Sequence, residues 1–199
     1  MPVERLPYAS VAALLAGEPI AEEDPSTRAL IRELRHVRRR GAFSRAEFLR
    51  MSRWKTPRAA PHYERNTPAQ VLRASRAALA ARTERDRLSP LLSLRGVSVP
   101  VASAILTLVD PRRYGVLDIR VWQLLHSLGA VEGKPSGRGF HAGDWEVYLD
   151  CLRRAARERG ASVRAVELTL FHCHRRFQSG RLYDPPAASA SRRSAATRD

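Results

Sequence analysis

The sequence predicts an all-α fold, and three observations support this prediction. Apolar residues recur three and four positions apart along most of the 199-residue chain, which is the spacing of one face of a helix. Residues that cap helix N-termini precede several of these runs. Stretches that alternate apolar and polar residues, as half-buried strands do, are absent from the sequence.

Three helices are predicted before the middle of the chain. The first spans residues 28–40, where the apolar residues fall on one face. Ser44 with Glu47, and Thr67 with Gln70, have the spacing of a capping box, in which two side chains satisfy backbone N–H groups of the first turn. We therefore expect one helix to begin after Ser44 and another after Thr67.

A tight hairpin and a capped helix are predicted in the least polar part of the chain. A leucine-rich helix is expected to stop at Gly96, and Pro100 suits the first turn of the next helix. Asp110 and the proline after it end that helix, and Asp118 lies where an N-cap is needed for an apolar run that Gly129 closes. Such a hairpin turns backbone N–H groups outward, which suits phosphate binding independent of base sequence.

Two longer helices are predicted near the C-terminus. Asp144 is the expected N-cap of a helix that ends near Gly160, and Ser162 is the expected N-cap of another that ends near Gly180. The chain is long enough for one core and a polar tail. The predicted divisions are an N-terminal helical segment at 1–40, one domain at 41–183 and a disordered basic tail at 184–199.

The charge of the chain favours a polyanionic partner. Lys and Arg number 35 against 20 Asp and Glu, a formal net charge of +15 that exceeds what solubility needs. An Arg-rich composition with only two lysines also arises in GC-rich genomes, so charge alone does not fix the partner. No run approaches the roughly 18 apolar residues of a membrane helix. We expect a cytoplasmic protein that is nucleoid-associated when bound to DNA, with no membrane contact.

The cysteines and histidines do not form a recognisable metal motif. Cys151 and Cys173 are too few for a cysteine-only zinc or iron–sulfur site. His172, Cys173 and His174 are adjacent, and neighbours on a helix point to different faces. The sequence therefore predicts no metal and no cofactor.

One pattern combines the hairpin with a distant carboxylate: Leu94, Gly96, Val97, Ser98 and Ala102 are followed by Asp118, 22 residues after Gly96. It resembles the helix-hairpin-helix, Gly/Pro and aspartate motif of the DNA glycosylase superfamily, which includes endonuclease III and the adenine and 8-oxoguanine glycosylases. Residues 54–58 (WKTPR), the hairpin with Pro100, and the segments 116–120 and 162–164 also resemble a family of uncharacterised bacterial proteins of about this length, over residues 40–180.

The resemblance implies a helix-hairpin-helix DNA glycosylase-like domain and base excision. A nucleotide must be flipped from the duplex, because its glycosidic bond is inaccessible within the stack. Cleavage of that bond builds positive charge on the sugar. Asp118 is the implied catalytic residue, which stabilises this charge and positions the attacking water. The alternative is that Asp118 only caps its helix.

Two departures from the superfamily pattern narrow the implied activity. Bifunctional members carry a Schiff-base lysine where this chain has Pro100, which cannot be that nucleophile. Ser98 stands in place of the second hairpin glycine. The expected function is a monofunctional DNA glycosylase without lyase activity, which acts as a monomer on a damaged or modified base in double-stranded DNA.

Further site residues follow from the same comparison. The expected DNA contacts are Gly96, Val97, Ser98, Arg120, Lys55 and Arg58, with Arg164 and His62 as further candidates, and the expected base-stacking residues are Trp54 and Tyr63. Trp54 also has the spacing of a core residue, and Arg120 alternatively pairs with Asp118. Two other functions remain open: a catalytically silent helix-hairpin-helix DNA-binding protein, and an interaction module with no nucleic-acid role.

Overall fold

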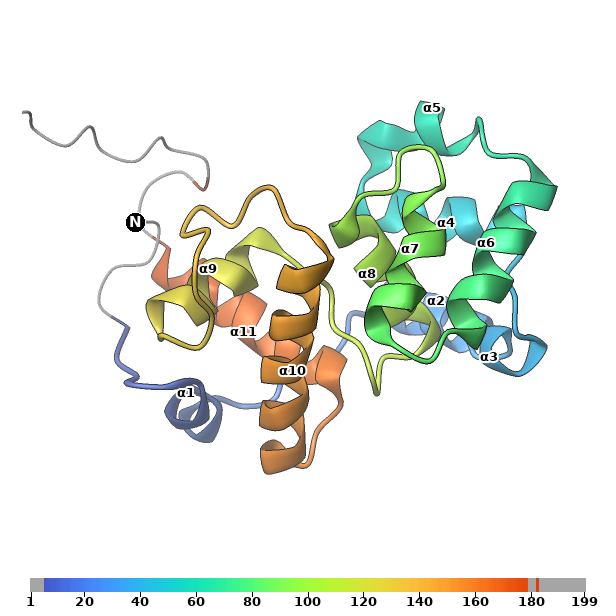
Figure 1. Ribbon diagram of the computed structural model, residues 1–199. Helices are drawn as coiled ribbons and strands as arrows, with labels where there is room; N and C mark the ends of the chain where they lie inside the picture. Colours follow the sequence, from blue (N-terminus) through green and yellow to red (C-terminus); the bar gives the residue numbers. More distant parts are fainter. Residues whose placement is uncertain (1–5, 179–181, 183–199) are drawn as a thin grey trace, which may run out of the picture.

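The computed structural model describes residues 6–178 and residue 182, and within them every regular element is a helix (Figure 1). The predicted all-α class is thereby confirmed. In chain order the elements are α1 (Val11–Gly17), α2 (Pro25–Leu34), α3 (Val37–Arg40), α4 (Arg45–Lys55), the 3-10 turn η1 (Pro57–Ala59), α5 (Ala60–Tyr63), α6 (Pro68–Ala80), α7 (Glu84–Leu92), α8 (Val99–Val109), α9 (Ile119–Ser127), α10 (Ala142–Arg159) and α11 (Val163–Phe177).

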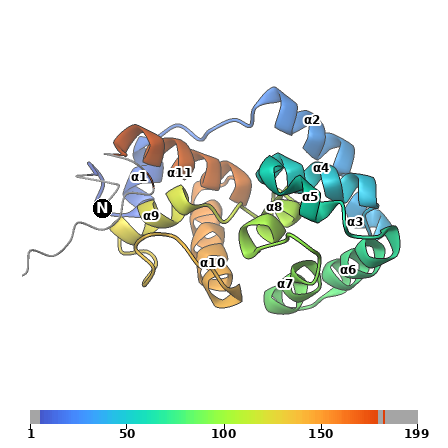
Figure 2. The same cartoon turned by 90° about the horizontal axis from the view of Figure 1, so that it is seen from above.

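The helices form two groups that the chain joins twice (Figures 1 and 2). Helices α1, α9, α10 and α11 lie together on one side, and α2 to α8 lie together on the other. Residues 18–24 carry the chain from the first group to the second, and residues 110–118 carry it back. Helix α10 packs against α7 and α8, so one continuous apolar core runs through both groups.

The predicted caps fix several helix boundaries. Ser44 and Glu47 form a complete capping box, and Thr67 and Gln70 form another. Asp118 caps α9 as predicted. These contacts satisfy N–H groups that have no partner within the helix itself.

Two predicted boundaries were wrong. The helix expected over 28–40 is broken into α2 and α3, because the chain tightens at Arg35, whose N–H donates to the Arg32 carbonyl only three residues back. Asp144 is not an N-cap: it is the third residue of α10, and its carboxylate reaches back to the N–H of His141 at 2.7 Å. His141 therefore begins the helix one turn earlier than predicted.

The N-terminal helices pack on both groups. Helix α1 contacts α10, whereas α2 contacts α8. Helix α11 ends at Phe177, while the expected end at Gly180 and the predicted tail at 184–199 lie outside the described residues. None of the helices in the described part of the chain has the length and apolar character needed to cross a membrane.

Candidate active site

The hairpin between α7 and α8 is held against α5 by close packing. Gly96 has φ +84°, and a Cβ placed there would lie 2.8 Å from His62 Cβ and 2.9 Å from Tyr63 Cδ1. Only glycine fits both the backbone conformation and the space. The buried Asn66 side chain fixes the turn, because it accepts the Arg95 N–H at 2.8 Å and donates to the Arg95 carbonyl at 3.1 Å.

Serine is compatible with the second hairpin position. Ser98 has φ −97° and ψ 171°, an extended conformation that any residue adopts, so no glycine is needed there. It precedes α8, its hydroxyl does not cap the helix, and its side chain is exposed. The N–H groups of Gly96 and Ser98 donate to no other described residue. Val97, by contrast, turns into the core.

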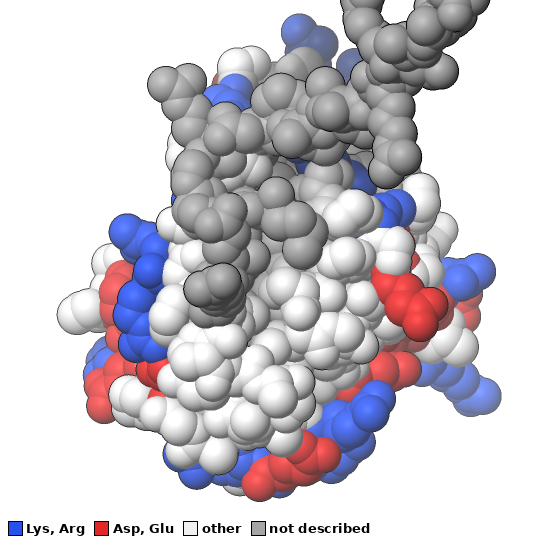
Figure 3. All heavy atoms as spheres, turned by 90° about the vertical axis from the view of Figure 1, so that its left-hand side faces the viewer, with Lys and Arg blue, Asp and Glu red and all other residues white. Residues whose placement is uncertain are grey.

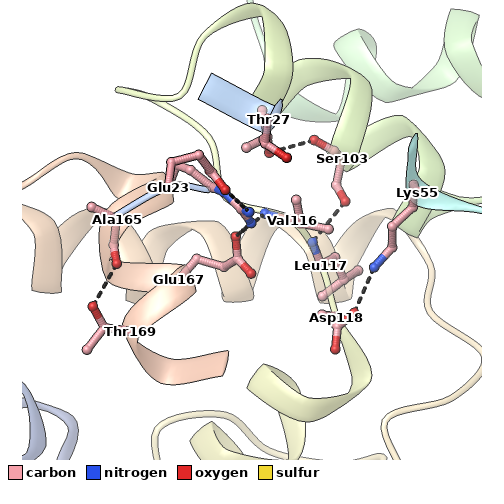
Figure 4. A network of polar contacts seen from close by, with 12 residues as sticks. Glu23, Thr27, Lys55, Ser103, Val116, Leu117, Asp118, Ala165, Glu167 and Thr169 are labelled. Carbon is pink, nitrogen blue, oxygen red and sulfur yellow. Dashed lines mark hydrogen bonds and ion pairs between the residues drawn. The ribbon is translucent and has the colours of Figure 1, made fainter. Parts of the chain in front are cut away.

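Asp118 combines a helix cap with an ion pair (Figure 4). Its Oδ1 accepts the Arg120 N–H at 2.9 Å, and its Oδ2 lies 2.7 Å from Lys55 Nζ. The Asp118 and Lys55 side chains are 21% and 18% exposed. Burial raises the pKa of Asp118, but the Lys55 ammonium and the Arg120 N–H outweigh it and hold that pKa below its usual value. Asp118 is therefore ionised at neutral pH.

Buried hydrogen bonds fix the backbone that leads into Asp118. The Leu117 N–H donates to Ser103 Oγ at 2.8 Å, and the Val116 N–H donates to Glu167 Oε2 at 3.2 Å (Figure 4). Tyr148 Oη donates to the Val116 carbonyl at 2.7 Å. Three helices, α8, α10 and α11, thus hold two consecutive residues before the carboxylate. The position of Asp118 is determined by the core and not by a free loop.

A buried ion-pair chain joins the two segments that connect the helix groups. Arg164 on α11 pairs with Glu167 and, at 2.6 and 3.0 Å, with Glu23. Burial raises the pKa of Glu167, whereas the Arg164 charge and the Val116 N–H oppose that rise. Glu23 belongs to the first connecting segment and Val116 to the second. Arg164, a candidate phosphate contact from sequence, instead links the carboxylates of Glu23 and Glu167 in this ion-pair chain.

A cleft of about 750 Å³ brings the hairpin and Asp118 together. It is lined by Lys55, Thr56, Pro57, Arg58, Ala59, Tyr63, Gly96, Ser98, Pro100, Val101, Leu117, Asp118 and Ile119. Five of these were predicted as catalytic or DNA-contacting residues from separate parts of the sequence. Arg58 is exposed and forms no ion pair with any described residue, so its guanidinium is free to meet an anion.

A smaller cavity of about 180 Å³ shares Lys55 and Asp118 with the cleft. Its other lining residues are Trp54, Val116, Arg164, Glu167, Leu168 and Phe171. Trp54 is fixed, because its Nε1–H donates to Thr27 Oγ1 at 2.9 Å and the Arg164 guanidinium lies 5.5 Å from its ring centroid. The cavity therefore has two aromatic walls, Trp54 and Phe171, beside the Asp118 carboxylate.

Some predicted contacts are committed elsewhere. Tyr63 is fully buried and packs edge-on against Phe48, with ring centroids 6.0 Å apart. It lines the cleft as part of the wall and is not free to stack on a base. The Arg120 guanidinium lies 5.9 Å from the Phe171 ring centroid and bonds to Gln178. Lys55, predicted to contact phosphate or a base edge, is paired with Asp118.

Four residues that shape the site were not singled out from sequence. Asn66 fixes the hairpin, Ser103 and Glu167 fix the backbone before Asp118, and Phe171 lines the smaller cavity. Glu167 and Phe171 lie four residues apart and three and seven residues after Arg164, so one face of α11 was recognisable. The sequence held no signal for which element that face meets.

No group of three or more His, Cys, Asp or Glu side chains that could hold a metal ion occurs among the described residues. Within the His172–His174 run, His174 is buried with its Nε2 3.1 Å from Gln123 Oε1, whereas His172 is exposed. Comparison with protein-family models, with curated proteins and with solved structures finds no match for this chain.

Proposed function

We propose that the chain is a monofunctional DNA glycosylase that hydrolyses the bond between a damaged or modified base and its deoxyribose in duplex DNA. One observation carries the proposal. The ionised Asp118 carboxylate lines the same cleft as Gly96 and Ser98 of the hairpin, whose N–H groups have no acceptor among the described residues. Phosphate-binding groups and a carboxylate are thus within reach of one nucleotide.

The hairpin and Arg58 supply contacts to the DNA backbone. Unpaired backbone N–H groups next to the N-terminus of α8 attract phosphate oxygens. The Arg58 guanidinium adds a charge-assisted contact that does not depend on base identity. These groups fix the duplex so that a flipped nucleotide enters the cleft.

Asp118 supplies the chemistry at the sugar. As the glycosidic bond breaks, its electron pair leaves with the base and positive charge develops on the sugar. The nearby carboxylate stabilises that charge and accepts a proton from the water that bonds to C1′, while the departing base takes up a proton from solvent. The smaller cavity is below the usual volume of a drug-sized ligand site, and its aromatic walls suit a single base.

Lys55 does not act as the nucleophile in this mechanism. Its amine is paired with Asp118 at 2.7 Å and is therefore an ammonium, which has no lone pair to attack C1′. Pro100, at the position where bifunctional enzymes carry lysine, offers no amine side chain. The product is expected to be an abasic site in an unbroken strand.

The same ion pair favours a second candidate, a DNA-binding protein without turnover. Lys55 already neutralises the carboxylate that the glycosylase mechanism requires. In that case the cleft binds duplex DNA and releases no base. The two candidates differ in one measurable product, the free base.

The deciding experiment is a screen of duplexes, each with one damaged or modified base, for release of free base. We expect the parent protein to release at least one base and the Asp118→Asn variant to release it far more slowly. Binding of every duplex without release of any base would refute the glycosylase and support the silent DNA-binding protein. Absence of duplex binding at low salt would refute both.

A further inference from the structure

Three hollows lined by arginine form a continuous surface that the proposed mechanism does not use. They have volumes of about 490, 200 and 390 Å³. The first two share Arg38, and the last two share Arg113. We name this surface the arginine track, and its arginines are Arg35, Arg38, Arg39, Arg87, Arg112, Arg113, Arg153 and Arg157.

The arginine track lies away from the cleft. Most of its arginines come from α3 and the turn before it, from residues 112–113 and from the C-terminal half of α10. In Figure 1 α3 and the end of α10 are at the bottom of the molecule, whereas α5, which packs against the hairpin, is at the top. The track and the hairpin therefore lie on different sides of the molecule in this view.

Six of the eight track arginines are exposed, whereas Arg87 is buried and Arg153 is partly buried. Its acidic neighbours, Asp110 and Glu84, have side chains only 6% and 18% exposed, and they pair with Arg38 and Arg153 at 3.1 and 2.7 Å. Four track arginines form no ion pair with any described residue: Arg35, Arg39, Arg112 and Arg157. The charge is not spread evenly, since the face in Figure 3 has an uncharged centre, with both basic and acidic side chains along its edges.

Part of the track is preorganised. The guanidinium groups of Arg113 and Arg153 lie 5.7 and 5.3 Å from the Tyr114 ring centroid. Arg153 Nε also donates to the Arg113 carbonyl at 3.1 Å. Because these contacts hold both arginines in place, less side-chain entropy is lost when they bind an anion.

We propose that the arginine track binds the phosphate backbone of a second DNA segment, so that one molecule holds two duplexes. Guanidinium groups spaced along a surface match a row of phosphates and require no base contact. A membrane surface fits less well, because interfacial binding also needs apolar side chains. The large exposed hydrophobic residues of the described chain, Leu72 and Val147, line none of the hollows. Only the first duplex rests on the proposed cleft function.

The test is capture of a fluorescent duplex by a second duplex fixed to beads, with the protein added. The track variant carries Arg39→Ser, Arg112→Ser and Arg157→Ser, and the control carries Arg73→Ser, Arg76→Ser and Arg154→Ser. All six arginines are exposed, both variants lose the same charge, and the control positions line none of the three hollows. We expect the track variant to lower capture by roughly tenfold, with single-duplex binding and capture by the control changed less than about threefold.

Equal capture by the track variant and the control would overturn the proposal. The proposal would also be overturned if capture followed dimer formation of the DNA-free protein, measured by sedimentation. A third refuting result is a track variant that loses binding to anionic lipid vesicles but captures the duplex as well as the parent protein does. Arg58→Glu in the cleft should leave a residual, salt-sensitive affinity for duplex DNA, and adding the track substitutions should remove this residual affinity. Complete loss of duplex binding with Arg58→Glu alone would contradict a second site. Capture of the second duplex does not require release of a base. The capture test and the base-release test can therefore give opposite results, and each refutes only its own proposal.

Discussion

Replacing Asp118 with Asn separates the structural role of this residue from its chemical one. Asn caps helices about as well as Asp, so the contact with the Arg120 N–H can be kept. What is lost is the pair with Lys55, whose two side chains are about one-fifth exposed. Because exposed pairs contribute about 0–1 kcal/mol and breaking a buried pair costs about 3–5 kcal/mol, we expect a loss of about 1–2 kcal/mol in the free energy of unfolding at neutral pH.

The stability difference should depend on pH with a definite sign. The folded-state pKa of Asp118 is lowered, so the pair contributes fully above the pKa of the unfolded carboxyl, near 3.8. The contribution disappears as the pH falls through the lower, folded-state pKa. Urea unfolding of parent and variant should therefore differ by a constant amount from pH 5 to pH 8 and converge below about pH 4.

Base excision and DNA binding should respond in different ways. Loss of one preorganised electrostatic group typically lowers a rate by about 10² to 10³, so release of the base should slow by that factor. Duplex affinity should stay equal or rise, because a negative charge is removed next to a polyanion. Excision and binding are to be measured on the same preparation.

Asp144→Asn is the matched control. Asp144 pairs with Lys134, the other lysine of the chain, and the two side chains are 16% and 24% exposed. This variant should lose a similar amount of stability and keep the parent rate of base excision. An Asp118→Asn variant that excises the base as fast as Asp144→Asn would show that Asp118 is only a cap.

Five further predictions test other parts of the structure. The logarithm of duplex affinity should fall linearly with the logarithm of salt concentration, with a slope of about −0.9 per phosphate contacted. Gly96→Val should weaken duplex binding, since a Cβ at this position would lie 2.8 Å from His62 Cβ. Fluorescence anisotropy titrations measure both effects. Borohydride should trap no covalent adduct with a substrate duplex, and an adduct that Lys55→Met removes would refute the ammonium assignment. Glu167→Gln should lower the free energy of unfolding in urea by about 1–3 kcal/mol, because it removes one of the two carboxylates that bond to the buried Arg164 and leaves Glu23 in place. Burial lowers the pKa of His174 to about 4. The free energy of unfolding should therefore fall by up to about 1.4 kcal/mol per pH unit as the pH is lowered from 6.5 to 4. His174→Leu should flatten this slope, and an unchanged slope in the variant would contradict the assignment to His174.

The parts of the fold that were predictable from sequence depend on contacts within a few residues. The capping box at Ser44, the left-handed turn at Gly96 and the cap at Asp118 each involve a side chain or a φ angle and the backbone next to it. Such interactions leave a local pattern. The wrong assignment of Asp144 has the same origin, because a carboxylate three residues inside a helix and one at its N-cap satisfy the same kind of N–H group.

The parts of the site that were not predictable depend on contacts between distant residues. Lys55 and Asp118 are 63 residues apart, and Glu167 and Val116 are 51 apart. A lysine in a helix reads the same from sequence whether it meets phosphate, solvent or a carboxylate. Which of these it meets is set by how α4 packs on α8 and how the returning segment lies on α11.

The N-terminal segment shows why a boundary drawn from periodicity does not describe this site. Glu23 lies within the segment predicted at 1–40, yet it pairs with Arg164. Arg164 also pairs with Glu167. Glu167 in turn accepts the N–H of Val116, which lies two residues before Asp118. The side chains of Glu23, Arg164 and Glu167 are largely buried. A buried charge destabilises the folded state unless its oppositely charged partner is present. The first connecting segment is therefore coupled to the position of the carboxylate, although it contributes no residue to the cleft.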